Sequence, residues 1–159
     1  MIILTYKQNN IPINEELLNE RNKNYINEKL ISDKEYFDHI FMDVGENINL
    51  DEEQRKIILR DEDCCLINAG AGSGKSTTMA AKVKYLVDKL KVKPQEIIML
   101  SFTKKSSEDL DEKVNDLLDL GITVSTFHSL GMKFIKKFYP YPIQVMKGKT
   151  NVEILLYNN

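Results

Sequence analysis

The middle of the chain alternates between two patterns of hydrophobic and polar positions. Short apolar runs at residues 64–67, 96–102 and 122–125 are each followed by a longer segment with apolar residues at helical spacing. This pattern predicts three buried strands, each followed by a helix. Strands that alternate with helices imply a parallel sheet with crossover helices, so the predicted fold class is α/β.

The three predicted helices each have one apolar face. The residues that form these faces are Met79, Val83, Leu86, Val87 and Leu90 in the first helix, Leu110, Val114, Leu117 and Leu118 in the second, and Phe127, Leu130, Phe134, Ile135 and Phe138 in the third. Thr103 is the expected N-cap of the second helix, which Gly121 ends. The third helix is expected to start near Thr126 and to stop at the prolines of residues 139–142.

The first 47 residues have a different pattern and are interpreted as a helical appendage, with the main domain at residues 48–159. A weak strand signal at residues 1–11 precedes a helical segment at 14–31 with a ragged apolar stripe. Ser32, with Glu35 three residues later, predicts a capping box that opens a second short helix. In the main domain, Asp51 is expected to cap a further helix that has Gln54 in its first turn.

The composition describes an ordinary soluble chain and does not by itself indicate nucleic-acid binding. The 159 residues include 42% hydrophobic and 29% charged residues and give a net charge of -2, although a local basic stripe remains compatible with that balance. The sequence has no apolar run long enough to span a membrane and no secretory signal, so we expect a cytoplasmic protein. Cys64 and Cys65 are adjacent in a predicted strand and point to opposite faces, so they are expected to be buried hydrophobic residues rather than a disulfide.

The turn between the first strand and its helix, AGAGSGKS, has the arrangement of a phosphate-binding loop. Glycines allow backbone N–H groups to converge on phosphate oxygens, Lys75 can reach the β- and γ-phosphates, and the Ser76 hydroxyl can coordinate Mg²⁺. The positive end of the helix dipole adds to this site. The alternative is a glycine-rich turn with an incidental lysine. The preceding strand and following helix favour a site for a nucleoside triphosphate with Mg²⁺, formed by Ala69, Gly70, Ala71, Gly72, Ser73, Gly74, Lys75, Ser76 and Thr77.

The segments after the second and third strands are expected at the same sheet edge, where ligands of parallel sheets bind. Thr103, Lys104 and Lys105 provide a hydroxyl, a helix N-terminus and two cations, which suit a phosphodiester backbone. Thr126, Phe127 and His128 provide the mixture that single-strand binders use. The residues alone favour simpler roles for each: a core position for Phe127 and a structural hydrogen bond for His128.

Gln54 lies shortly before the phosphate loop and also has two interpretations. Its side-chain amide could pair with the edge of an adenine. From the residues alone, a solvated position on the helix surface is favoured.

Four segments together resemble a known family. LDEEQRKII, INAGAGSGKST, IIMLSFTKKSSEDLDEKV and TVSTFHSLGMKFIKK resemble, in order and spacing, the beginning of superfamily 1A DNA helicases of the UvrD/Rep type, and look most similar to helicase IV. The resemblance covers residues 48–137, and the helical segment before it fits more loosely.

The resemblance implies a RecA-like phosphate-loop domain of an ATP-dependent motor that steps 3′ to 5′ along single-stranded DNA. It implies that Gln54 reads adenine, that Gly72 to Ser76 bind ATP with Mg²⁺, and that the Thr103 and Thr126 segments follow the DNA. The family commonly has asparagine at the position of Lys105 and paired alanines at those of Ser106 and Ser107.

Hydrolysis also needs an aspartate for Mg²⁺ and a glutamate to activate water, on a following strand. No apolar strand of this sequence ends in such a pair. We therefore expect the incomplete front of a motor whose missing partner is the C-terminal motor domain, and expect the chain alone to bind nucleotide weakly and not to unwind DNA. A small-molecule kinase or other phosphate-loop NTPase, and a non-catalytic nucleotide-binding module, are the competing hypotheses.

Overall fold

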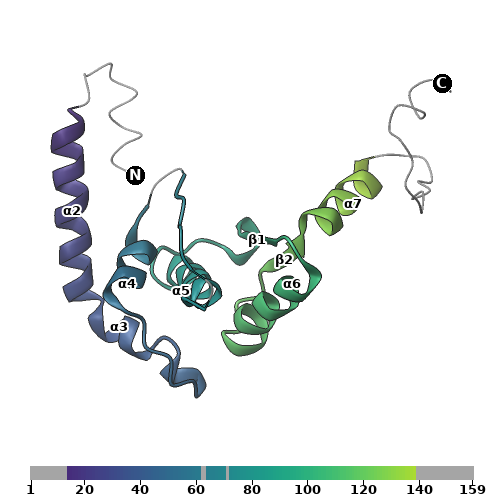
Figure 1. Cartoon of the computed structure of the whole chain (residues 1–159), viewed down its shortest axis with the longest axis horizontal. Coiled ribbons are helices and arrows are strands. Elements are labelled where there is room, and N and C mark those ends of the chain that lie inside the picture. The colour runs from purple at the N-terminus through teal and green to yellow at the C-terminus, as the bar shows by residue number, and fades with distance from the viewer. Residues whose placement is uncertain (1–13, 62–63, 71, 139–159) are drawn as a thin grey trace.

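The computed structural model describes residues 14–61, 64–70 and 72–138 and shows an α/β arrangement in which helices outnumber strands (Figure 1). The expectations for residues 1–11 and for the prolines after residue 138 lie outside these ranges. The elements, in chain order, are α2 (Glu15–Ser32), α3 (Lys34–His39), the 3₁₀ turn η1 (Met42–Val44), α4 (Glu52–Leu59), α5 (Lys75–Asp88), the 3₁₀ turn η2 (Pro94–Glu96), β1 (Ile98–Ser101), α6 (Lys104–Asp111), the π-helical η3 (Glu112–Leu117), β2 (Thr123–Thr126) and α7 (Phe127–Phe138).

The sheet consists of two parallel strands. β1 pairs with β2 from Ile98 opposite Thr123 to Ser101 opposite Thr126, and α6 with η3 forms the crossover between them. These strands confirm the second and third predicted strands and their parallel relationship. The predicted apolar face of the crossover is also confirmed, because Leu110, Val114 and Leu118 are buried.

The first predicted strand, residues 64–67, is wrong in the described structure. These residues form no strand, Leu66 is 93% exposed, and Cys64 and Cys65 are free and exposed rather than buried. An apolar run becomes a buried strand only when a neighbouring strand satisfies its backbone groups, and the two strands described here pair only with each other.

The helix starting at Asn14 is confirmed, but the capping box predicted at Ser32 is wrong. The Asn14 side chain accepts hydrogen bonds from the backbone N–H groups of Glu16 and Leu17, and α2 continues through Ser32. Asp33, rather than Ser32, precedes α3, and its N–H is satisfied by the carbonyls of Lys29 and Ile31. Because the chain stays close to helical through this junction, α3 needs no side-chain cap.

The N-terminal helices and the phosphate-loop helix share one hydrophobic core. Phe37 of α3 is fully buried and stacks on Tyr85 of α5, with ring centroids 5.7 Å apart. The buried cluster draws on α3, α4, α5, β1 and the crossover; its members are Phe37, Ile40, Phe41, Leu50, Ile58, Leu59, Ala80, Ala81, Val83, Tyr85, Met99, Leu110, Val114, Leu118, Leu120 and Ile122. Residues 33–41 are therefore integral to the packing around α5.

Two predicted apolar faces are only partly buried. On α5, Val83 is buried but Met79 is exposed, as is Leu90 just beyond the helix, whereas Ala81 and Tyr85 are buried and Tyr85 faces Phe37 of α3. On α7, the phenylalanines 127, 134 and 138 are exposed, although the helix itself is present as predicted. No helix among the described residues is long and apolar enough to cross a membrane.

Tyr85 and Asp33 form a buried hydrogen bond that joins α5 to the junction before α3. The Tyr85 hydroxyl donates to Asp33 Oδ2 over 2.9 Å, and Lys29 and Lys89 lie 3.7 and 3.8 Å from the same carboxylate. Burial first, and then the hydrogen bond and charge of Asp33, raise the pKa of Tyr85 above the ordinary value of 10.0.

We predict that Tyr85→Phe lowers the free energy of unfolding by about 1–2 kcal/mol at pH 7, because Asp33 loses a buried donor. Since the pKa of Tyr85 is raised in the folded state, its stabilisation is fully present below pH 10 and declines above it, so the difference between the two proteins narrows there. Urea unfolding at pH 7 and above pH 10 measures this, with exposed Tyr25→Phe as control. A difference that stays constant with pH would contradict the assignment.

Candidate functional site

The candidate nucleotide site is the loop that leads into α5. Gly72 and Gly74 have φ values of 76° and 77°, in the left-handed region that favours glycine, and Gly74 is the N-cap of α5. The Ser73 hydroxyl donates to the Gly70 carbonyl over 2.8 Å, and the Thr78 N–H donates to the Gly74 carbonyl over 2.8 Å. The loop therefore turns sharply and presents the N-terminus of a 14-residue helix.

Lys75 lies over its own loop. Its ammonium group donates to the carbonyl oxygens of Ala69, at 2.9 Å, and Gly70. The lysine is exposed and on the first residue of α5, while Ser76 and Thr77 follow in the first turn and are half-buried. A cation and a helix N-terminus thus converge on one short loop, which suits an anionic ligand.

Gln54 reaches this loop from α4. The predicted Asp51 cap is present as a full capping box: Gln54 N donates to Asp51 Oδ1 over 2.8 Å, and Asp51 N donates to Gln54 Oε1 over 2.9 Å. The other end of the amide, Nε2, lies 3.4 Å from the Ser73 carbonyl oxygen. The structure therefore brings Gln54 to the loop. Both ends of its amide form contacts within the protein, so the amide is not simply solvated.

Lys82 fixes the opposite end of α4 to α5, a role that sequence reasoning missed. Its ammonium group donates to the carbonyl of Ile58, at 2.6 Å, and to that of Arg60, so it satisfies carbonyls at the end of α4. Burial lowers the pKa of Lys82. The sequence has no local signal for this contact, because the two helices meet only through tertiary packing.

The two segments after the strands lie at one edge of the sheet, as predicted. Thr126 ends β2 opposite Ser101, and Thr103 follows β1 two residues later. Thr103 caps α6 by accepting from Ser106 N over 3.1 Å, and the Thr126 hydroxyl accepts from Ser129 N over 3.2 Å. Both turns are thus built by local hydroxyl hydrogen bonds.

This edge presents cations and aromatic rings to solvent. Lys104, Lys105 and His128 are exposed, and the Lys104 ammonium forms an exposed ion pair with Glu108 at 3.3 Å. Phe127 is 69% exposed and is therefore not a core residue in the described structure. Phe102 was expected at the end of a buried strand, but it lies one residue beyond β1 and is 95% exposed.

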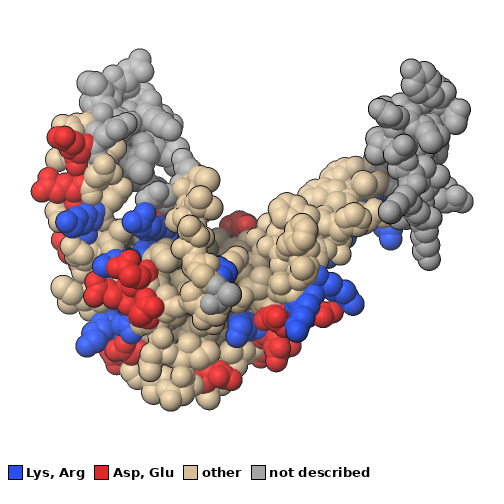
Figure 2. Space-filling model, in the orientation of Figure 1, with Lys and Arg blue, Asp and Glu red and all other residues tan. Residues whose placement is uncertain are grey.

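The nucleotide loop and the strand edge form two candidate sites on different elements. The loop lies between α4 and α5, whereas the edge belongs to β1, β2 and the helices that follow them. Among the described residues, no group of three or more His, Cys, Asp or Glu could hold a metal ion. In the face shown in Figure 2, basic and acidic side chains are interspersed, so any phosphate contacts at the edge are local.

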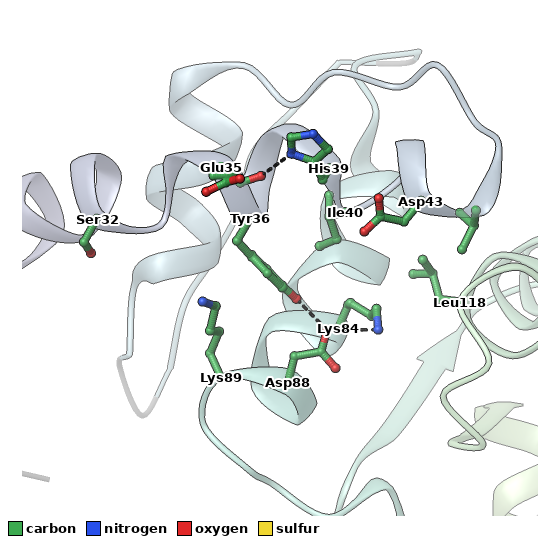
Figure 3. A pocket seen from close by; sticks show the side chains of 11 residues that line it. Ser32, Glu35, Tyr36, His39, Ile40, Asp43, Lys84, Asp88, Lys89 and Leu118 are labelled. Carbon is green, nitrogen blue, oxygen red and sulfur yellow. Dashed lines mark hydrogen bonds and ion pairs between the residues drawn. The ribbon is translucent and has the colours of Figure 1, made fainter.

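A cavity of about 540 Å³ lies at the far end of α5, against α3 (Figure 3). Asp88 joins two of its polar groups: the Tyr36 hydroxyl donates to Asp88 over 3.0 Å, and Lys84 pairs with Asp88 at 2.9 Å. Burial and the neighbouring Asp88 carboxylate raise the pKa of Tyr36. Because Lys84 and Asp88 lie more than two helical turns beyond Lys75, this cavity is separate from the loop.

Comparisons with known proteins match this part of the chain to DNA helicases. The model of the UvrD/REP helicase N-terminal domain matches residues 50–154. DNA helicase IV of Escherichia coli is 32% identical over 93 residues, covering 58% of this chain and 14% of that protein. ATP-dependent DNA helicase Rep of Buchnera aphidicola is 37% identical over 94 residues, covering 57% and 14%. ATP-dependent DNA helicase PcrA of Staphylococcus epidermidis is 33% identical over 92 residues, covering 56% and 13%. The chain thus spans about one seventh of the length of these relatives.

The conformation of Gly74 leads to a stability prediction. A Cβ on Gly74 would lie 2.8 Å from Gln54 Nε2 and would sit on a residue with φ of 77°, whereas a Cβ on Gly70 meets no atom within 4 Å and φ is not positive there. We predict that Gly74→Ala lowers the free energy of unfolding by about 1–3 kcal/mol, and that Gly70→Ala changes it by less than about 0.5 kcal/mol. Urea unfolding followed by circular dichroism distinguishes them, and equal effects would refute the assigned conformation.

Proposed function

Because this chain belongs to the UvrD/Rep helicase N-terminal domain family, we propose that it forms the ATP-binding part of an ATP-dependent DNA helicase that moves 3′ to 5′ along single-stranded DNA. In this proposal the fold is a RecA-like phosphate-loop domain. The observation that carries it is the arrangement of Gly74 in left-handed conformation, Lys75 at the start of α5, and Gln54 against the same loop.

The residues of the loop fit the phosphates of ATP. The N–H groups at the start of α5 lack intrahelical acceptors and point out of the helix end, so they can donate to phosphate oxygens. Lys75 would exchange the carbonyls of Ala69 and Gly70 for the β- and γ-phosphates, and the Ser76 hydroxyl would be a ligand of Mg²⁺. Gln54 would hydrogen-bond the adenine edge. When bound, ATP supplies through its hydrolysis the free energy for stepping.

The strand edge is the proposed DNA contact. The exposed ammonium groups of Lys104 and Lys105 would neutralise backbone phosphates beside the N-terminus of α6, while the exposed ring of Phe127 offers a surface for base stacking. The hydroxyl groups of Thr103 and Thr126 shape the two turns, and His128 completes the polar surface.

The proposal also includes a protein partner, the C-terminal motor domain of the parent chain. Large apolar side chains on α7, among them Phe134 and Phe138, are exposed and would be available to pack against further protein. The 159-residue chain alone is accordingly proposed to bind nucleotide weakly and not to unwind DNA.

We predict that Lys75→Ala weakens binding of ATP with Mg²⁺ at least about tenfold, because an ionic hydrogen bond to phosphate is lost. Chemical-shift titration by NMR measures weak binding and reports folding at the same time. The control is Lys84→Ala, which removes a cation from the far end of the same helix and should leave the affinity unchanged. Equal affinities for the three proteins would place the nucleotide elsewhere.

We predict that Lys104→Ala/Lys105→Ala weakens binding of a fluorescent single-stranded oligonucleotide and reduces its salt dependence. Two lost phosphate contacts should decrease the slope of log K against log[salt] by about 1.4. Lys23→Ala/Lys34→Ala removes two exposed cations from the N-terminal helices and should leave the slope unchanged. No binding at low salt by the folded chain would contradict the proposed DNA contact.

A further inference from the structure

Both ends of the Gln54 side-chain amide form contacts within the protein. Oε1 accepts from Asp51 N over 2.9 Å within the capping box of α4, and Nε2 lies 3.4 Å from the carbonyl oxygen of Ser73, 19 residues away in sequence. The capping box alone would cap the N-terminus of α4. The contact with Ser73 is therefore an additional link between α4 and the loop.

The Ser73 carbonyl belongs to the peptide that joins Ser73 to Gly74. In a trans peptide the C=O and the following N–H point in opposite directions. An amide that holds the Ser73 carbonyl toward α4 consequently directs the Gly74 N–H away from α4. Reversing this peptide would exchange a donor for a carbonyl oxygen at that position, where a phosphate would be repelled.

One of the two residues that flank this peptide leaves it little intrinsic preference. Gly74 has no Cβ, and glycine populates positive and negative φ about equally. Gln54 Nε2 lies 2.8 Å from the place of a Cβ on Gly74, so a larger residue at this position would push the amide away from its present place. The loop is thus locally permissive, and an external contact determines the orientation of the peptide.

We propose that Gln54 is a positioning residue for the phosphate loop: by binding the Ser73 carbonyl, it keeps the Gly74 N–H oriented for a phosphate. The inference rests on the proposed function and adds to the adenine contact of Gln54. A carbonyl oxygen has two lone pairs and an amide nitrogen two hydrogens, so each end of Gln54 keeps capacity for an adenine edge while it holds the loop. Base recognition and phosphate binding are then coupled through one side chain.

A ligand without a base separates this role from adenine recognition. We expect Gln54→Ala to weaken binding of inorganic triphosphate with Mg²⁺ about fivefold, the effect of one lost hydrogen bond. ATP should lose this factor and, in addition, the adenine contact. In the ligand-free protein, amide hydrogen exchange at Ser73, whose N–H donates to the Gly70 carbonyl, should become about fivefold faster because the loop loses its link to α4.

Two further variants separate positioning from helix capping. Asp51→Ala removes one half of the capping box but leaves Gln54 in place, so it should destabilise α4 without changing the triphosphate affinity. Gln54→Glu can still accept from Asp51 N but cannot donate to the Ser73 carbonyl, so it should keep α4 intact and accelerate exchange at Ser73. Exchange is the measurement for this variant, because its added charge would also repel triphosphate.

The inference is wrong if Gln54→Ala weakens only ATP binding, leaving triphosphate affinity and loop exchange unchanged. Gln54 would then be an adenine contact alone, and the proposed function would stand. If the unmodified chain binds neither ATP nor triphosphate, the proposed function fails for this chain, while the exchange rates of the ligand-free variants still decide whether Gln54 positions the loop.

Discussion

The position of α5 depends on the stacking of Phe37 against Tyr85. The rings lie 5.7 Å apart within the main hydrophobic core, and the Tyr85 hydroxyl is held by Asp33 at the start of α3. Arg55 of α4 adds to this cluster, because its guanidinium lies 5.8 Å from the Phe37 ring centroid and forms an ion pair with Asp38 at 2.7 Å. The helix that carries the candidate nucleotide loop is therefore fixed from the N-terminal side of the chain.

Because α5 is fixed in this way, the loop before it has a defined position against α4. α4 is joined to α5 near its start through Gln54 and the loop, and at its end through Lys82. Both contacts use backbone carbonyls that the α-helix or the turn leaves available. A shift of α4 along α5 would break both, so the packing that buries Ile58 and Leu59 also maintains the distance between Gln54 and Ser73.

The sequence was most informative where the interactions are local. The caps at Asp51 and Thr103 each depend on a side chain and a backbone N–H within three residues, and the structure contains both. The parallel strands were predictable because short apolar runs alternate with segments of helical spacing. At Ser32 the local rule failed, because the backbone of Asp33 was already satisfied by the preceding helix.

The sequence was least informative where burial depends on distant partners. The apolar run at residues 64–67 and the apolar face of α7 carry the correct composition, yet Leu66 and Phe138 are exposed because the described elements provide nothing to cover them. Complete burial of such a side chain would contribute about 1.5–3 kcal/mol. By contrast, the sequence placed Phe37 on a short helix of the N-terminal appendage, but it did not predict that this ring would be fully buried against Tyr85 of α5.

Gly74 combines both kinds of constraint. A local pattern identified it, since a glycine before Lys75 is typical of a phosphate loop. Only the fold shows a second reason for glycine: a φ of 77° strains any residue with a Cβ, and a Cβ would also displace the Gln54 amide from its present position. A glycine normally makes a loop flexible. At Gly74 the absence of a side chain also lets the Gln54 amide approach the loop and restrain it, so the same feature that allows the turn allows the contact that holds it.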